Sequence, residues 1–293
     1  MKTPDLIIPH LDLIEKRLHE IIPPIDEPHS ILFEAARYSL LLPAKRFRPL
    51  LILSVLDDFE SPIEWGIDPA CSLEMVHTYS LIHDDLPCMD DDDLRRGSPT
   101  LHKVYSEAQA VLAGDYLLTY AFEVLSNAPY LSAEKKVALI RLLSNRSGGD
   151  GMIGGQIIDI LHEGKKILPE TLKLMFAKKT AALIATALEF GGLIANLSAE
   201  DTHHLCAAGY ALGIGYQYID DILDLIGEEV EIGKPVGSDF GNDKAGALSL
   251  YSTDEAQEKA QSYYRKAVAE LELLSRPTPQ ILSLFEKCFY RAK

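Results

Sequence analysis

Residues 81–100 read Leu81-Ile-His-Asp-Asp-Leu-Pro-Cys-Met-Asp-Asp-Asp-Asp-Leu-Arg-Arg-Gly-Ser-Pro-Thr100, so that the apolar end of a helix becomes a run of carboxylates. Carboxylates at this density repel one another unless cations lie among them, and flexible sets of oxygen ligands suit hard cations such as Mg²⁺. Arg95 and Arg96 follow at once, and their fork-shaped guanidinium groups fit phosphate oxygens. The segment therefore indicates a site for Mg²⁺ and a diphosphate. The alternative is a solvated acidic loop, which is what most runs of charge are.

The composition allows a large packed core and limits the kinds of partner. The chain has 293 residues, of which 47% are hydrophobic, and a formal net charge of −16. This acidic balance argues against binding to nucleic acid or to an anionic membrane surface. An anionic substrate would therefore need local positive charge, from a metal ion and a few lysine and arginine side chains.

The start of the chain and its cysteines favour a cytoplasmic protein. The first residues, Met1-Lys-Thr-Pro-Asp-Leu6, lack the basic region and apolar core of a secretion signal. The cysteines lie far apart without a CxxC pair, which is typical of free thiols: Cys71, Cys88, Cys206 and Cys288. Segment 180–197 approaches the length of a membrane span, but it carries Glu189 and is predicted to be a buried helix, so we expect no membrane span.

Hydrophobic residues recur with helical spacing along nearly the whole chain, and no segment alternates convincingly as a strand does. Prolines mark several of the expected helix ends, and Ser132 and Ser198 are expected to cap the starts of two helices. We predict helices over residues 6–22, 31–42, 49–59, from 69 to the acidic segment, 104–112, 114–126, 132–145, 170–195 and 198–226, with two more after residue 246. With no internal repeat and no linker, residues 1–293 are predicted to form one all-α domain.

A second acidic cluster, Asp220-Asp221-Ile-Leu-Asp224, lies at the end of another apolar helix. Residues four apart lie about 40° apart around a helix, so Asp220 and Asp224 share a face. Carboxylates on an apolar helix are costly to bury without partners, and a metal ion supplies such partners. The alternative is an exposed helix end, but two such clusters favour opposed metal-binding walls.

Positive charge gathers where the third predicted helix begins. The segment Pro43-Ala-Lys45-Arg-Phe-Arg48-Pro49 places three cations at a helix start, where backbone N–H groups already attract anions. Acidic residues would be the ordinary choice there, so the cations indicate a bound anion rather than plain surface charge. His77 lies seven residues before Asp84, on nearly the same helical face, although a lone histidine is more often a satisfied core residue.

Several further residues are unremarkable one by one. Lys179 and Thr180 open the apolar part of a long helix, Gln217 precedes the second acidic cluster, and Lys234 lies in the loop after it. Segment 148–156 is rich in glycine but lacks the Gly-Lys-Ser/Thr ending of a phosphate loop. We therefore expect its small residues to let two helices approach closely.

The ordered set of motifs resembles the trans-isoprenyl diphosphate synthases, and within them the bacterial farnesyl diphosphate synthase type. The resemblance covers nearly the whole chain. The motifs that carry it are Asp84-Asp-Leu-Pro-Cys-Met-Asp90, Arg95-Arg96-Gly97, Gln217-Tyr-Ile-Asp220-Asp-Ile-Leu-Asp224, Lys45-Arg-Phe-Arg48-Pro49, Gly155-Gln156 with Asp159, Lys179-Thr180 and Gly233-Lys234-Pro235. The resemblance implies the isoprenoid synthase type I fold, a helical bundle around a central cavity, and a homodimer.

It also implies a reaction, in which isopentenyl diphosphate condenses with an allylic diphosphate such as dimethylallyl or geranyl diphosphate to give farnesyl diphosphate. Asp84, Asp90 and Asp220 would hold three Mg²⁺ ions, with Asp85, Asp221 and Asp224 acting indirectly or through water. The allylic diphosphate would be clamped by Arg95, Lys179 and Lys234, and isopentenyl diphosphate by Lys45, Arg48, His77 and Arg96. The catalytic residues would be Lys179, Thr180 and Gln217, the last two steadying the allylic carbocation.

The number of carbons in the product is expected to depend on which side chains block the path of the growing tail. Tyr79 lies five residues before Asp84, about 7–8 Å deeper along the helix. An aromatic residue here and two extra residues in the first motif resemble the fifteen-carbon synthases. We therefore expect Tyr79, with Ser80 beside it, to set the chain length.

Other interpretations remain open. Geranyl or geranylgeranyl diphosphate synthases share the motifs, and a non-catalytic regulatory subunit shares the family, although such a subunit usually loses one acidic cluster. A terpene cyclase would need a different second metal motif, and a His-Asp phosphohydrolase would need more histidine ligands. Two departures from the family pattern are Pro43-Ala44, where Gly-Gly is usual, and Ala245-Gly-Ala247 after Lys244.

Overall fold

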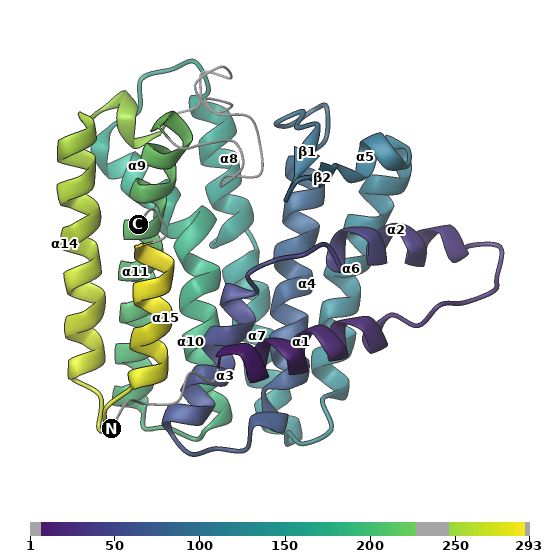
Figure 1. The fold of residues 1–293 in the computed structure, drawn as a ribbon, viewed down its shortest axis with the longest axis horizontal. Helices are drawn as coiled ribbons and strands as arrows, with labels where there is room; N and C mark the ends of the chain where they lie inside the picture. Colours follow the sequence, from purple (N-terminus) through teal and green to yellow (C-terminus); the bar gives the residue numbers. More distant parts are fainter. Residues whose placement is uncertain (1–6, 227–245, 291–293) are drawn as a thin grey trace.

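The computed structural model describes residues 7–226 and 246–290 and confirms the predicted all-α class (Figure 1). The helices are α1 (Ile7–Ile21), α2 (Ser30–Leu40), α3 (Phe47–Asp58), α4 (Ile67–Asp84), α5 (Leu101–Val104), α6 (Glu107–Asn127), α7 (Ala133–Ser147), α8 (Met152–His162), α9 (Pro169–Phe176), α10 (Ala182–Ile194), α11 (Ala199–Ile226), α14 (Thr253–Glu272) and α15 (Pro279–Phe289). Short helical turns add η1 (Ile63–Trp65), η2 (Ala177–Ala181) and η3 (Ala247–Ser249).

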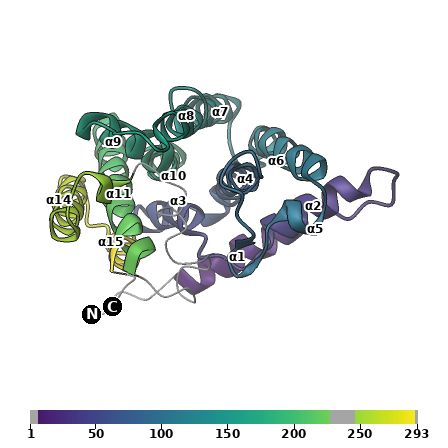
Figure 2. The same ribbon diagram turned by 90° about the horizontal axis from the view of Figure 1, so that it is seen from above.

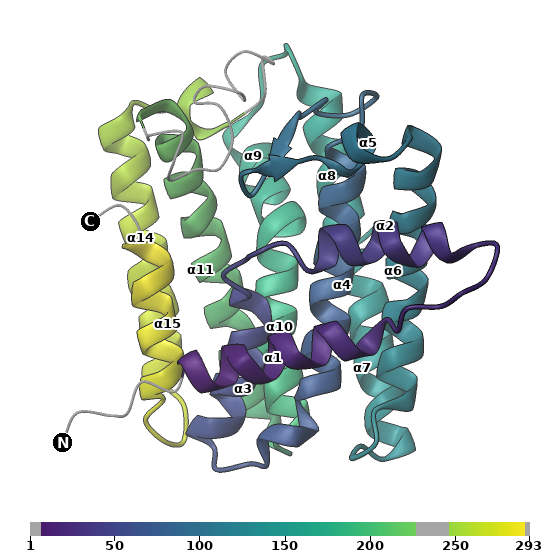
Figure 3. The same ribbon diagram turned by 45° about the vertical axis from the view of Figure 1, so that its right-hand side comes forward.

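The long helices stand side by side, and α1 and α2 cross over them on one face (Figures 1 and 3). Seen from above, α3 and α10 lie in the middle, with α14 and α15 on one side and α6 on the other (Figure 2). The packing agrees with this arrangement, because α10 packs on both α3 and α11, and α11 packs on α14.

The two central helices are apolar around their whole circumference, which is what a buried helix requires. In α3 every residue from Leu50 to Leu56 is buried, and in α10 nearly every residue is buried. A Cβ atom added to Gly191 would lie 2.4 Å from Cβ of Val55, so this glycine lets the two helices touch. Within residues 7–226 and 246–290, none of the helices combines the length and the apolar character needed to cross a membrane.

Two predicted serine caps are confirmed. The Ser132 hydroxyl accepts a hydrogen bond of 3.3 Å from the backbone N–H of Lys135, and that of Ser198 accepts one of 2.9 Å from Asp201. Each hydroxyl satisfies one of the backbone donors that a helix leaves unpaired in its first turn. The starts of α7 and α11 are thus fixed by local sequence.

The prediction of separate helices over 104–112 and 114–126 was wrong, because α6 runs unbroken from Glu107 to Asn127. Gly114 lies inside this helix and allows the side chain of His83 to pack against it. A Cβ atom at this position would lie 2.2 Å from Nε2 of His83 on α4, so the missing side chain makes room for an imidazole.

The acidic segment and the long helix also differ from the expectation. Residues Leu94–Arg95 (β1) pair antiparallel with Ser98–Pro99 (β2), although no strand was predicted from the sequence. The helix predicted over 170–195 is interrupted by η2, a π-helical turn, and α8 was not predicted as a separate helix.

The glycine-rich segment does let two helices approach closely, as predicted. A Cβ atom on Gly155 of α8 would lie 2.2 Å from the backbone nitrogen and 2.6 Å from Cα of Lys179 in η2. Backbone atoms at this distance leave no room for any side chain.

We expect Gly155→Ala to lower the free energy of unfolding by about 1–3 kcal/mol, because α8 and η2 must move apart. Gly149→Ala is the matched control, since a Cβ atom there meets nothing within 4 Å. Thermal and urea unfolding of both variants measure the difference. Equal stability of the two variants would contradict the packing role.

Candidate active site

The two acidic clusters lie at the same end of the molecule. Asp84 is the last residue of α4, and Asp220 lies in the last turns of α11. The C-terminal ends of both helices point to the upper end of the bundle in Figures 1 and 3. Two segments that are distant in the chain therefore bring their carboxylates to one end of the fold.

The first cluster is shaped by a tight turn after α4. The backbone N–H of Asp90 donates a 2.9 Å hydrogen bond to the carbonyl of Asp84, and that of Asp91 donates one of 3.1 Å to Leu86. Pro87 and Cys88 are exposed at the tip of this turn. The extra length of the motif is therefore accommodated by a turn that projects into solvent. The backbone hydrogen bond across this turn holds Asp84 next to Asp90.

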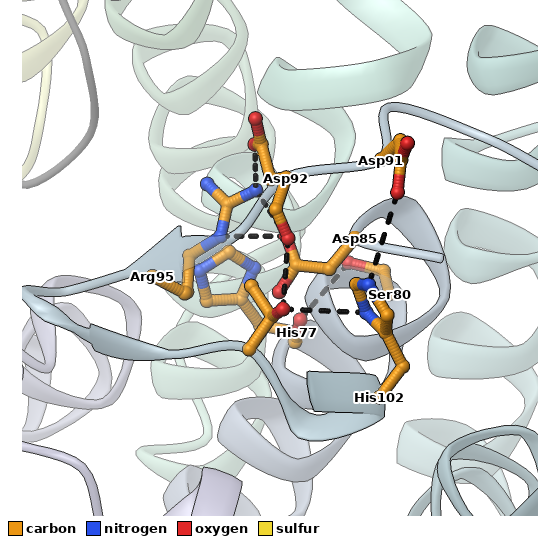
Figure 4. Close-up of polar contacts among 8 residues, drawn as sticks. His77, Ser80, Asp85, Asp91, Asp92, Arg95 and His102 are labelled. Carbon is orange, nitrogen blue, oxygen red and sulfur yellow. Dashed lines mark hydrogen bonds and ion pairs between the residues drawn. The ribbon is translucent and has the colours of Figure 1, made fainter. Parts of the chain in front are cut away.

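Arg95 is held between two carboxylates of this cluster (Figure 4). Its Nε donates to Oδ1 of Asp85 at 2.9 Å, and its Nη2 contacts the same oxygen and Oδ2 of Asp92 at 2.9 Å. Burial raises the pKa of Asp85 to about 6, although Arg95 acts in the opposite direction. Asp85 thus orients Arg95, which agrees with an indirect role for this carboxylate.

The hairpin that carries Arg95 and Arg96 is fastened at both ends. Arg96 and Gly97 form its turn with φ angles of 54° and 74°, and glycine adopts the second at no cost. The Tyr38 hydroxyl on α2 donates a 2.8 Å hydrogen bond to the carbonyl of Pro99, and the Thr100 hydroxyl donates to that of Asp92. These bonds hold both arginines beside α4.

The cations at the start of α3 do not all serve an anion site. Arg46 is buried, and it donates to Glu15 at 2.7 Å and to Glu74 at 2.8 Å. The interpretation of three cations as one anion-binding group therefore needs correction, because Arg46 is used in internal ion pairs. Lys45 is exposed, and Arg48 is partly buried with an Nε that meets no hydrogen-bond acceptor among the described residues.

His77, Arg48 and Arg96 lie in one cationic neighbourhood. Burial, and then the charges of Arg48 and Arg96, lower the pKa of His77 well below its usual value. The imidazole is therefore neutral near pH 7, so that it offers a ligand an N–H group rather than a charge. Burial also lowers the pKa of Arg48 and of Arg96.

A cavity of about 720 Å³ opens beside the second acidic cluster. Its walls combine the predicted catalytic residues with carboxylates of α11 and α8: Lys179, Thr180, Gln217, Asp221, Asp224 and Asp159. Lys179 donates to Oδ2 of Asp159 at 2.5 Å. Apolar side chains such as Met175 and Phe176 complete the walls.

A chain of hydrogen bonds crosses this wall. The Thr180 hydroxyl donates to Oε1 of Gln217 at 2.7 Å, and Nε2 of Gln217 donates to Oδ1 of Asp221 at 2.8 Å. The other oxygen of Asp221 accepts a 2.6 Å bond from the backbone N–H of Ala247. Ala247 makes this bond with its backbone alone, which explains why the departure from the family pattern at Ala247 is compatible with an ordered site.

The π-helical turn η2 presents Lys179 and Thr180 to this cavity. An extra residue in one helical turn rotates the following side chains and is typical of functional sites. Gly213 on α11 allows the turn to sit close, because a Cβ atom there would lie 2.5 Å from Cα of Ala181. Sequence periodicity alone did not reveal this turn.

The two predicted chain-length residues differ in their surroundings. Tyr79 is buried, and its ring packs edge-to-face against that of His83, with 5.7 Å between the ring centroids. Its hydroxyl has no hydrogen-bond partner among the described residues. Burial, with a smaller effect of Asp84, raises the pKa of Tyr79 to about 12. The Ser80 hydroxyl turns back and donates to the carbonyl of His77 at 2.9 Å. Lys234, predicted to bind substrate, lies outside the described residues.

The carboxylates suit metal ions that share their ligands with a substrate. Among residues 7–226 and 246–290, no three His, Cys, Asp or Glu side chains are close enough to hold a metal ion on their own. Mg²⁺ commonly uses one or two carboxylates and completes its shell with water and substrate phosphates. Carboxylates at two helix ends, with guanidinium and ammonium groups beside them, fit a Mg²⁺ ion that is bound jointly by protein and substrate phosphates.

A helical bundle with acidic helix ends and a cavity lined by both charged and apolar side chains at one end has the architecture of an isoprenoid synthase, and relatives of known structure share it. A geranyltransferase of Helicobacter pylori, solved with magnesium and isoprenyl diphosphate, superposes with a TM-score of 0.88 at 34% identity, covering 99% of this chain and 98% of that one.

Sequence comparison agrees. A farnesyl diphosphate synthase of Bacillus subtilis is 44% identical over 256 residues, 87% of this chain and 86% of that protein. A chloroplastic geranylgeranyl pyrophosphate synthase of Capsicum annuum is 38% identical over 95% of this chain and 76% of that protein. Residues 29–275 match the polyprenyl synthetase family, and the chain belongs to this family of prenyltransferases.

Proposed function

We propose that the protein adds isopentenyl diphosphate to dimethylallyl diphosphate and then to the resulting geranyl diphosphate, loses inorganic diphosphate and a proton at each addition, and releases farnesyl diphosphate. The observation that carries this proposal is the cavity beside α11, where Lys179, Thr180, Gln217 and Asp221 share one wall. The relatives of 41–45% identity, all named farnesyl diphosphate synthases, support the fifteen-carbon product.

The allylic diphosphate binds between the two acidic clusters. Asp84 and Asp90 on one side and Asp220 on the other would hold Mg²⁺, for which we propose three ions as the resemblance implies. Bound Mg²⁺ withdraws charge from diphosphate and so makes it a better leaving group. Lys179 and Arg95 add positive charge beside the leaving oxygens, and Lys234 would do so from outside the described residues.

The protein's own oxygens then face the cationic carbon chain. The Thr180 hydroxyl is directed by Gln217, and Gln217 is fixed by Asp221, so their dipoles are already ordered before substrate enters. Ordered dipoles stabilise developing charge without reorganisation at the moment of reaction. Met175 and Phe176 keep water from the carbocation.

Isopentenyl diphosphate occupies the cationic neighbourhood at the end of α4. Arg96 and Arg48 supply charge, Lys45 closes the pocket from its exposed position, and neutral His77 donates one N–H. These groups hold the second substrate so that its double bond faces the allylic carbon, which lowers the entropic barrier to their reaction.

We expect Asp84→Ala and Asp220→Ala each to lower turnover by about a thousandfold, because each removes a magnesium ligand. The measurement is product formation from isopentenyl and dimethylallyl diphosphate with Mg²⁺, followed by chromatography. Asp254→Ala, at the exposed start of α14, is the control and should keep full rate. Circular dichroism checks that all variants fold. A near-normal rate in either variant would refute the metal assignment, and a wild-type protein without activity would refute the function.

We expect Tyr79→Ala to release products longer than fifteen carbons, because the tyrosine closes the path of the growing tail. Tyr130→Ala, at an exposed position, serves as the control. Chromatography of dephosphorylated products distinguishes fifteen-carbon from twenty-carbon alcohols. If Tyr79→Ala still stops at fifteen carbons, another residue sets the limit. A wild-type product of twenty carbons would favour the geranylgeranyl alternative.

We also propose that the protein is a homodimer joined through the side formed by α6, α7 and α8, which are neighbours in Figure 2. An exposed apolar stripe on α8 supports this: Ile153, Ile157, Ile160 and Leu161, at 36–57% exposure. Residues at this spacing share one helical face, and such a face is typical of an interface. On α6, Val111 and Leu112 are exposed as well.

We expect Ile157→Asp to convert the dimer to a monomer, because the charge must be buried in the interface. Leu273→Asp, at an equally exposed leucine after α14, should leave the dimer intact. Analytical ultracentrifugation at several concentrations gives the mass. A monomeric wild type, or a dimer that survives Ile157→Asp, would contradict this interface.

A further inference from the structure

We propose that Glu74 is a positioning residue for isopentenyl diphosphate, because its buried carboxylate fixes Arg96 directly and the start of α3 through Arg46. This inference rests on the function proposed above. Glu74 lies on α4 three residues before His77, so both side chains project from one face of the helix. Glu74 is 1% exposed, and such a buried carboxylate needs partners.

One carboxylate oxygen serves two arginines from different elements. Oε1 of Glu74 accepts a 2.8 Å hydrogen bond from Nη1 of Arg46 and lies 3.7 Å from Nη2 of Arg96. Arg46 precedes α3, whereas Arg96 lies in the turn of the β1–β2 hairpin. Glu74 therefore joins α4 to both segments that carry the proposed isopentenyl diphosphate ligands.

Arg46 transmits this anchoring to the backbone beside it. Its Nε donates to Glu15 at 2.7 Å, and its Nη2 donates to the carbonyls of Leu40 at 2.7 Å and Leu42 at 3.1 Å. The residue has a φ angle of 45°, a left-handed conformation that the surrounding contacts must hold in place. Because Lys45 and Arg48 extend from the same few residues, fixing Arg46 fixes their starting points.

Glu74 also counters the repulsion within the cationic group. Burial lowers the pKa of Arg96, and the positive charges of Arg46 and Arg48 lower it further. The negative charge of Glu74 acts in the opposite direction and raises this pKa. The pKa of Arg48 is likewise lowered by burial, with Glu74 among the charges that oppose the change. Three guanidinium groups thus stay charged and close together around one buried carboxylate.

Electrostatics and positioning predict opposite results for removal of the Glu74 charge. If Glu74 acted only through its charge, Glu74→Gln would make the pocket more positive and would tighten binding of a diphosphate. If it positions Arg96, the same variant releases that guanidinium and weakens binding. The sign of the effect therefore distinguishes the two roles.

We expect Glu74→Gln to raise the KM for isopentenyl diphosphate about tenfold, with much smaller changes in kcat and in the KM for the allylic substrate. Asp68→Asn is the control, because Asp68 on the same helix accepts a 2.7 Å bond from Arg17, away from the cationic group. Asp68→Asn should leave both KM values unchanged. Glu74→Asp keeps the charge on a shorter side chain, so it gives a second test if Glu74→Gln does not fold.

A double-mutant cycle with Arg96→Gln tests whether Glu74 acts through Arg96. We expect the loss in Glu74→Gln/Arg96→Gln to be clearly smaller than the sum of the two single losses, because part of the effect of Glu74 passes through Arg96, whereas a merely structural role would make the losses add. Calorimetric titration with isopentenyl diphosphate alone should reproduce the loss of affinity without turnover. An active wild-type protein whose folded Glu74 variants keep normal KM values would overturn this inference, whereas an inactive wild type would overturn the function itself.

Discussion

Carboxylates placed at the ends of apolar helices are the constraint on which the rest of this structure depends. Helix α4 is buried over most of its length, yet it ends in Asp84, and α11 carries its acidic cluster in a similarly apolar setting. Buried carboxylates are costly unless donors face them. Here Arg95 faces Asp85, Lys179 faces Asp159, and Gln217 faces Asp221. Under the proposed function, each of these donors would also contact a diphosphate or a carbocation, so the groups that stabilise the folded protein would also be the groups that order its site.

Close backbone approach is what brings these donors to the site. Lys179 lies in a π-helical turn that packs directly on the backbone of α8 at Gly155 and close to α11 at Gly213. Any side chain at either glycine would push the turn away from Gln217. Helix α10, which follows η2, is almost entirely buried, and the last two residues of α9 before η2 are buried as well, so the irregular turn between them sets where the lysine and threonine point.

The sequence predicted those features that depend on local spacing, and it missed those that depend on distant partners. Helical periodicity and the Ser132 and Ser198 caps need only neighbours in the chain, so these predictions were confirmed. The prediction assigned Arg46 to an anion site because local sequence does not reveal its ion-pair partners. These partners, Glu15 and Glu74, lie 31 and 28 residues away in the chain. The unbroken helix α6 was missed for the same reason, since the imidazole that explains Gly114 comes from α4.

The glycine-rich segment was interpreted correctly because small residues at helical spacing carry the signal themselves. The positions of Lys179, Thr180 and Gln217 in one cavity wall followed from resemblance rather than from spacing.

The proposed reaction requires two diphosphates of the same charge to be treated differently. One must leave as an anion, and the other must stay attached to its carbon chain. A diphosphate held between carboxylates is bound through metal ions, which withdraw charge and promote ionisation. A diphosphate held by arginines and a neutral histidine receives hydrogen bonds and charge without a strong Lewis acid, and its C–O bond stays intact. In the proposed reaction, the separation of the carboxylates and Lys179 beside the cavity from the arginine group around Glu74 would therefore do more than bind two substrates, because it would decide which of them ionises.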